Sequence, residues 1–255
     1  IDVSAGAISG NGGFIEVSAF DQLGFYGVLN GRAPPGYKSG TAILDPTNAS
    51  IGSVLISVDT IVWATNNITI DGNVAIASGI TLNLYADHNS ETAGTWHDGT
   101  GTIMPSGDYT ISGTSATLNL KAGSGIGASG TRIKTNVARL SAENSTSNDI
   151  YIGQGSTSLT FTSIENDAAD RFVNLKADGD LLIRWIFSDN VVLEATGSID
   201  GLGTLPNNIE ANDLDLNAGE NIGANYPLFV NAVTFSIYAN NGNIGAETST
   251  KIGFV

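Results

Sequence analysis

The 255-residue chain has no cysteine, two histidines, one methionine and ten Lys and Arg residues against 25 Asp and Glu residues. Without cysteine it forms no disulfide, no thiolate nucleophile and no cysteine-ligated zinc site, and two histidines argue against a dedicated transition-metal site. A net charge of −15 would repel a phosphate backbone, because nucleic-acid binding needs clustered Lys and Arg. We therefore expect no metal, no cofactor and no nucleic-acid partner.

Long apolar runs and helical patterns are also missing. No apolar stretch approaches the roughly 20 residues that a membrane-spanning helix needs, and no apolar pattern of helical spacing lasts beyond about two turns. The chain begins at Ile1, with neither an initiator methionine nor a signal-like segment. We expect an all-β protein without a membrane span, and a processed product or a fragment of a longer chain.

A six-residue unit recurs along the chain. It reads LNLYAD from residue 82, LNLKAG from 118, VNLKAD from 173 and LDLNAG from 214, with weaker copies between these. The starts are 36, 55 and 41 residues apart, close to multiples of a unit of about 18 to 20 residues. Apolar and polar residues alternate within each copy, which indicates a strand with one buried face.

The tripeptide Ile-Gly-Ala recurs from residues 126, 222 and 244, where glycine allows the positive φ of a sharp corner. Short strands of this kind bury their apolar face only by stacking on their neighbours. We therefore predict one domain over residues 1–255, a parallel β-helix (solenoid) of about 12 coils with loop insertions near residues 22–38 and 86–110. An antiparallel β-sandwich would instead show hairpin turns every 8 to 12 residues or so. One internal column is predicted to contain Leu84, Leu120, Leu140, Leu175, Leu193, Leu216 and Ile237.

Three segments resemble a known family. The sequences GTAILDPTNASI (residues 40–51), LNLKAGSGIGASG (118–130) and LDLNAGENIGA (214–224) resemble repeats of filamentous-haemagglutinin-like exoproteins, which are passengers and adhesins of two-partner secretion in Gram-negative bacteria. The resemblance implies a right-handed parallel β-helix that crosses the outer membrane unfolded. It also implies a stalk or an adhesive surface rather than a catalyst.

The longest break in the repeat, residues 86–110, holds both histidines. Loops that project from a rigid scaffold often carry binding residues, so Trp96, His97 and Asp98 are candidate contacts for a sugar or an adventitious metal. The alternative is an exposed loop whose Trp96 packs back onto the coil surface. The two histidines lack the spacing and the third ligand of a zinc site.

The second break, residues 22–38, carries Phe25, Tyr26 and Tyr37 near Arg32. Aromatic residues beside arginine are typical of protein-binding hot spots. The alternative is that this segment covers one end or one side of the solenoid.

The sequence LLIRWIF of residues 181–187 breaks the alternation around Trp185. In either register, large apolar side chains would lie on the outer face or Arg184 would be buried. We expect a loop of the same chain, or else a partner, to cover this strand, which makes Trp185 a candidate contact.

Paired carboxylates are candidate catalytic groups, because β-helices host polysaccharide lyases and hydrolases. Asp178 and Asp180 have the spacing of one strand face, and Asp167 and Asp170 lie near Arg171. Neither set presents the acids with a basic group that such enzymes use, so we predict no catalytic residues. A polysaccharide-active enzyme is the alternative function, and weak Ca²⁺ binding by the acidic loops stays open.

The combined expectation is an extracellular segment of a bacterial cell-surface protein, either an adhesin or a filament stalk. Its partners would be a glycan or protein of a host or neighbouring cell, or further copies stacked end to end. Residues 1–3 and 251–255 both read as strands cut in mid-repeat, and unpaired strand edges favour such continuation.

Overall fold

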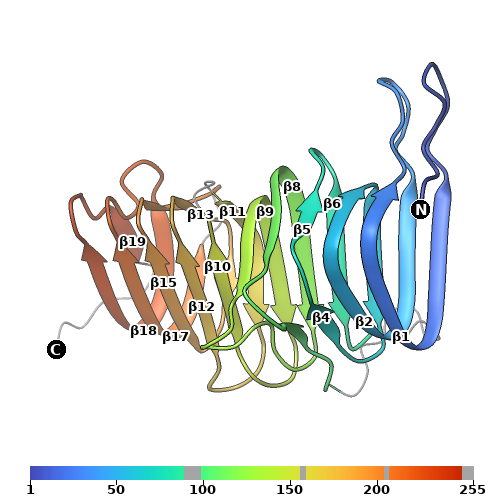
Figure 1. The fold of residues 1–255 in the computed structure, drawn as a ribbon. Helices are drawn as coiled ribbons and strands as arrows, with labels where there is room; N and C mark the ends of the chain where they lie inside the picture. The colour runs from blue at the N-terminus through green and yellow to red at the C-terminus, as the bar shows by residue number, and fades with distance from the viewer. Residues whose placement is uncertain (89–98, 156–158, 204–206, 249–255) are drawn as a thin grey trace.

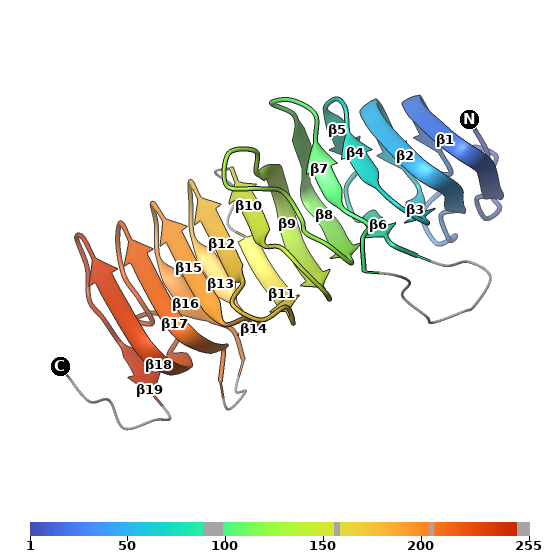
Figure 2. The same cartoon turned by 90° about the horizontal axis from the view of Figure 1, so that it is seen from below.

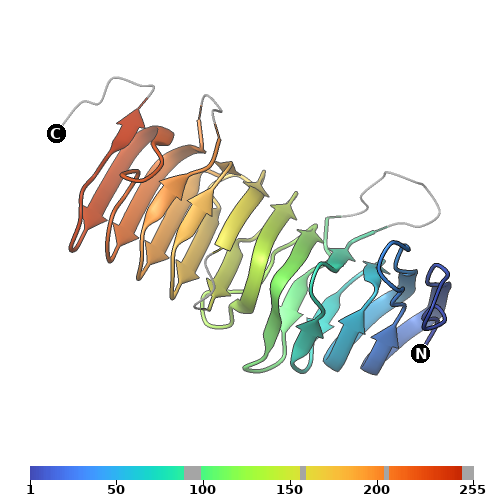
Figure 3. The same cartoon turned by 90° about the horizontal axis from the view of Figure 1, so that it is seen from above.

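The computed structural model describes residues 1–88, 99–155, 159–203 and 207–248 (Figure 1). Across these ranges it contains β-strands and no helix, and the strands pair in parallel as a β-solenoid of about nine turns. Figures 2 and 3 show the stack from below and above, with β1 and β19 at opposite ends. The predicted parallel β-helix is confirmed, whereas the predicted number of coils is too high.

The strands follow one another along the chain with short corners between them. They are β1 (Phe14–Asn30), β2 (Thr41–Ser57), β3 (Asp59–Ala64), β4 (Ile68–Ile70), β5 (Val74–Ile76), β6 (Thr81–Ala86), β7 (Ile103–Pro105), β8 (Thr110–Ala122), β9 (Ile133–Asn144), β10 (Ile150–Gln154), β11 (Leu159–Asn166), β12 (Phe172–Ala177), β13 (Leu181–Ile183), β14 (Ile186–Phe187), β15 (Asn190–Ala195), β16 (Ile199–Gly201), β17 (Ile209–Ala218), β18 (Leu228–Ala239) and β19 (Ala246–Thr248).

One turn of the solenoid has three strand sections. The strand β2 pairs with β3 through its first residues, with β4 through its middle and with β5 through its end. The turn that contains β2 therefore has one long, bent strand where the following turn has three short strands, β3, β4 and β5. At the bend in β2, Ser53 takes a φ of 47°.

The spacing between turns explains the coil count. Leu120 pairs with Leu84 after 36 residues, whereas Ala142 pairs with Leu120 and Ile164 with Ala142 after 22 residues each. The 36-residue interval is thus one turn with an insertion, not two turns of 18. An ordinary turn takes about 22 residues and the chain accordingly makes fewer of them.

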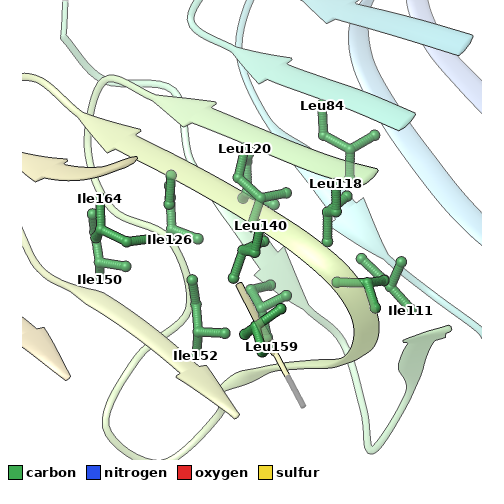
Figure 4. Close-up of a cluster of buried hydrophobic side chains, with 14 of the residues drawn as sticks. Leu84, Ile111, Leu118, Leu120, Ile126, Leu140, Ile150, Ile152, Leu159 and Ile164 are labelled. Carbon is green, nitrogen blue, oxygen red and sulfur yellow. The ribbon is translucent and has the colours of Figure 1, made fainter. Parts of the chain in front are cut away.

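The core consists of several internal columns rather than the predicted single one (Figure 4). The first column contains Leu84, Leu120 and Ala142, and Leu140 belongs to a neighbouring column with Leu118. The predicted residues of the later turns form a second column on another face, which joins Ile133, Ile152, Leu175, Leu193, Leu216 and Ile237. The prediction of one column was therefore wrong, although the predicted leucines are all buried.

The same sequence unit can thus build two different faces. In LNLKAG, Leu120 belongs to the first column, and in LDLNAG, Leu216 belongs to the second. What the repeats share is a local arrangement of strand, glycine corner and strand. Gly127 and Gly223 both adopt the predicted positive φ at these corners (65° and 66°), whereas Gly245 in the third copy does not.

The segment LLIRWIF resolves its conflict by bending. Leu181, Ile183 and Ile186 are fully buried, while Arg184 is exposed, because the chain turns between β13 and β14. The side-chain amide of Asn208 donates to the carbonyl oxygens of Ile183 (3.0 Å) and Arg184 (3.1 Å). The buried Asn208 side chain therefore fixes this bend, but Phe187 stays exposed and Trp185 half-buried, so the described residues do not show the expected cover of this strand.

Both predicted insertions are shorter than expected. Residues 22–30 continue β1, and β7 lies inside the range 86–110 and pairs with β4. The part that does leave the first turn, residues 31–40, stands beside residues 1–13 (Figure 1). The amide of Ala5 donates to the carbonyl of Arg32 (2.8 Å), and that of Gly12 donates to the carbonyl of Lys38 (2.9 Å). We call residues 1–13 and 31–40 the N-terminal projection.

Within the described ranges, the structure contains no helix long and apolar enough to cross a membrane.

Candidate ligand groove

A groove of about 440 Å³ crosses the outer surface of β9, β10 and β12, which are neighbours in the middle of the stack (Figure 1). We call it the β10 groove. Its volume lies within the range of small-molecule sites, roughly 300–1,000 Å³. Its lining residues are Thr110, Arg132, Lys134, Thr135, Asn136, Gly153, Gln154, Gly155, Lys176 and Asp178.

The groove arises from the register of the strands. In the parallel ladder, Gly153 pairs with Lys134 on one side and with Lys176 on the other. Two lysines therefore flank a position with no side chain, whereas the Asn136 side chain approaches Gly155, with Cγ 3.2 Å from where a Cβ atom would lie. A Cβ atom at Gly153 would meet only the Arg132 side chain, with Cδ at 3.7 Å, so the space above Gly153 is open.

Positive charge gathers at this groove although the chain as a whole is acidic. Three of the ten Lys and Arg residues line it. Lys134 forms an ion pair with Asp108, and Lys176 pairs with Glu194 at 3.0 Å. Both pairs are exposed to solvent, and exposed ion pairs contribute only about 0–1 kcal/mol. A bound anion could therefore replace the carboxylate partner of either lysine with only a small loss of free energy.

Arg132 is held more firmly than the lysines. Its guanidinium donates to the carbonyl of Asn174 (3.0 Å) and to Oδ1 of the same residue (2.7 Å), and it lies 5.4 Å from the ring centroid of Tyr151. Burial, followed by the charge of Asp149, raises the pKa of the Tyr151 hydroxyl, so this ring stays neutral at pH 7. Arg132 and Tyr151 therefore form one wall of the groove region, beside the solvent-exposed lysine side chains.

Polar residues also form the buried layer beneath the groove. The Thr135 hydroxyl donates to Gln154 Oε1 (2.6 Å), and Gln154 Nε2 donates to the carbonyl of Val137 (3.0 Å). The same ladder contains Ile111 in the turn before and Ala177 in the turn after. Along this ladder, the inward position is therefore polar at Thr135 and Gln154, beneath the groove, and apolar in the turns on either side.

A second hollow, of about 490 Å³, is lined by Asp180, Leu182, Asp200, Asn225 and Tyr226. Asp200 is buried and accepts from the amide and the side chain of Asn225 (3.3 and 3.0 Å), and Asp180 accepts from the amide of Ser198 (2.8 Å). These carboxylates hold loops in place. Asp178 and Asp180 lie in the turn between β12 and β13, so the expectation that they share a strand face was wrong.

The predicted contact residues do not gather at one place. Trp96, His97 and Asp98 lie outside the described residues. Phe25 is buried in β1 as part of the core, because residues 22–30 are strand rather than loop. Tyr26 is exposed on the same strand, and its hydroxyl donates to Asp71 Oδ2 (3.1 Å). Hydrogen bonds from Ser106 and then Tyr26 hold the pKa of Asp71 below its usual value.

Tyr37 and Trp185 are separated from each other and from Tyr26. Tyr37 is exposed in the N-terminal projection, where its amide donates to the carbonyl of Pro34 (3.1 Å). Trp185 is half-buried and stacks on Phe187, with ring centroids 6.1 Å apart. In the described part of the chain, no group of three or more His, Asp or Glu side chains is placed to hold a metal ion.

Sequence reasoning missed the β10 groove. Arg132 and the Asn174 that fixes it are 42 residues apart, and only the register of β9, β10 and β12 brings them together. The available signal was the pair of glycines in the strand YIGQG, residues 151–155, where alternating outward positions lack side chains.

Comparison of the chain with protein-family models, with curated proteins and with solved structures gives no match.

Proposed function

We propose that this chain is an extracellular structural and adhesive segment of a secreted bacterial surface protein, an adhesin or a filament stalk, and that it is not an enzyme. The observation that carries the proposal is the stack of about nine turns with internal columns in register. Such a stack is a stiff rod that holds outward side chains at fixed spacing. The resemblance of its LDPTN and LNLKAG segments to haemagglutinin-like repeats supports the same role.

The chemistry of the two hollows supports binding rather than catalysis. The β10 groove offers cations and hydrogen-bonding groups around an open floor, which suits recognition of a ligand. In the second hollow, Asp180 and Asp200 accept backbone hydrogen bonds that stabilise neighbouring loops. A glycosidase would instead need one carboxylic acid and one carboxylate facing a common bond.

Location on the cell surface is the first test of this proposal. Antibodies raised against the 255-residue segment should label intact source cells without permeabilisation, and external protease should remove the label. Purified segment fixed to beads should also be retained on cell surfaces, whereas beads with the Leu120→Asp variant should be retained less because its core is disrupted. Labelling only after permeabilisation would overturn the proposal. So would depolymerisation of an acidic polysaccharide that is lost on Asp200→Asn.

A further inference from the structure

We propose that the β10 groove binds the carboxylate of an acidic sugar, a uronate unit of an anionic polysaccharide, with Lys134, Lys176 and Arg132 as its cationic contacts. This inference rests on the proposed adhesive role and names the ligand class of the groove.

The geometry provides an anion position above Gly153. Neighbouring strands lie about 4.8 Å apart, so the Cα atoms of Lys134 and Lys176 are separated by roughly 10 Å across the glycine. Long lysine side chains can converge over that distance on one carboxylate, and they give up only exposed ion pairs to do so. The Arg132 guanidinium lies on the same side of the sheet, against Tyr151.

The remaining lining residues select a ligand with hydroxyl groups as well as a charge. Asp178 lines the groove and, as a carboxylate, accepts hydrogen bonds but donates none. Thr110 and Asn136 add groups that both donate and accept. A bare inorganic anion would leave Asp178 facing like charge, whereas the hydroxyl groups of a sugar can donate to it.

The charge of the whole chain favours a sparsely charged ligand. At −15, the protein repels dense polyanions such as nucleic acids or heavily sulfated chains over most of its surface. A uronate unit carries a single carboxylate and no sulfate ester, so it supplies one anion to the groove and brings less charge to the acidic surface than a heavily sulfated sugar does. The groove volume of about 440 Å³ leaves room for a sugar ring, not only for its carboxylate.

Gly153 provides a variant that blocks the groove without disturbing the fold. The nearest neighbour of an added Cβ atom is Arg132 Cδ at 3.7 Å, an ordinary contact, and Gly153 has no positive φ. Gly153→Glu would place a carboxylate between Lys134 and Lys176, where the ligand carboxylate is proposed to lie. Gly153→Thr would fill the space without charge.

The matched control is Lys121→Gln. Lys121 lies outside the groove and pairs with Glu143 at 2.6 Å, so this variant removes the same charge from an equivalent lysine on another face. Lys176→Gln removes that charge within the groove. Circular dichroism and thermal melting should show all four variants folded.

The experiment is calorimetric titration of the purified chain with tetrasaccharides of galacturonate and of mannuronate. At least one should bind the wild-type chain and the Lys121→Gln variant alike, and its methyl ester and a neutral galactose oligomer should not bind. Gly153→Glu should weaken binding at least tenfold, and Gly153→Thr and Lys176→Gln should weaken it severalfold.

Equal binding by wild-type and Gly153→Glu protein would overturn the inference, as would the absence of binding by both uronates. Tighter binding of a sulfated tetrasaccharide that is unaffected by Gly153→Glu would show general charge attraction and also overturn it. These outcomes are separate from the test of cell-surface location. A surface-exposed protein that ignores uronates overturns the groove assignment alone, and an internal protein that binds them overturns the adhesive role alone.

Discussion

The middle turns and the end turns of the solenoid are built from the same alternating strands, but they cover their apolar side chains to very different degrees. Leu118 and Leu140 in the middle are completely buried. In β1 the inward-pointing Val17 and Leu23 are only half-buried, and so are the inward-pointing Phe235 and Ile237 in β18. The difference shows that burial in this fold comes from the turns above and below, not from the strand itself.

Buried amide side chains also join successive turns in the middle of the stack. At one corner of the middle turns, Asn144 and Asn166 are buried, and Asn144 Nδ2 donates to Asn166 Oδ1 (3.0 Å). The same Asn144 accepts from the amide of Gly125 (2.6 Å). The middle is therefore specified by hydrogen bonds between successive turns as well as by apolar packing.

The largest expected effect comes from a charge in the first column. Leu120→Asp should lower the free energy of unfolding by about 5 kcal/mol or more, because it removes packing and buries a carboxylate between Leu84 and Ala142. Ile237→Asp, at a half-buried position of β18, should cost less than half of that. Urea unfolding of both variants checks the comparison, and equal losses would contradict the dependence on neighbouring turns.

The next effect separates backbone strain from a clash at the corners. Gly127 and Gly79 both have positive φ (65° and 75°), but a Cβ atom at Gly127 would run into the carbonyl oxygen of Tyr151, whereas at Gly79 it would meet nothing within 4 Å. Gly79→Ala should cost about 1 kcal/mol from strain alone. Gly127→Ala should cost about 3 kcal/mol, since the backbone must also shift. Thermal melting of the two variants provides the measurement. Similar losses of stability would show that the close approach of neighbouring turns at Gly127 does not add to the strain.

The sequence predicts the fold well because strand alternation and glycine corners are local signals. The units around Leu120 and Leu216 each predict a strand, then a corner, and the structure contains both. Local signals do not specify which face a unit builds. That depends on how many residues each preceding corner consumes, and so two units with nearly the same sequence occupy different columns.

The β10 groove could not be predicted for a related reason. Its two lysines come from β9 and β12, and they meet only because Gly153 pairs with both Lys134 and Lys176. The composition of residues 22–38 predicts aromatic residues such as Phe25 to be surface contacts. The structure buries Phe25 instead, because an alternating strand directs it inward.

A smaller effect tests the buried corner amides. Asn144→Ala should lower the free energy of unfolding by about 2 kcal/mol. In the variant, the buried amide of Gly125 loses its acceptor, Asn144 Oδ1, and Asn166 Oδ1 loses a donor, Asn144 Nδ2. Asn119 makes comparable side-chain hydrogen bonds to Asn83 and Ser141 on a partly exposed face. Asn119→Ala should therefore cost about 0.5–1 kcal/mol, since water can replace the lost partner. Urea unfolding of the two variants provides the measurement, and a larger loss at Asn119 would contradict the importance of burial.

The smallest effect has the opposite sign and depends on pH. Burial, followed by the charges of Asp167 and Glu143, raises the pKa of the Glu165 carboxyl above 4.5, although Lys121 opposes this. The folded state therefore binds the proton more tightly than the unfolded state, and stability falls as pH rises from 4.5 through the folded pKa. Glu165→Gln should raise stability at pH 7 by about 0.5 kcal/mol or less, because solvent screens a partly exposed group. At pH 3, which is well below 4.5, Glu165 is protonated in both states and the gain should disappear. Glu194→Gln, which removes the partner of Lys176, should give no gain at either pH. Calorimetric melting at both pH values checks the sign, and a variant that is less stable than wild type at pH 7 would show that the ionised Glu165 is stabilising.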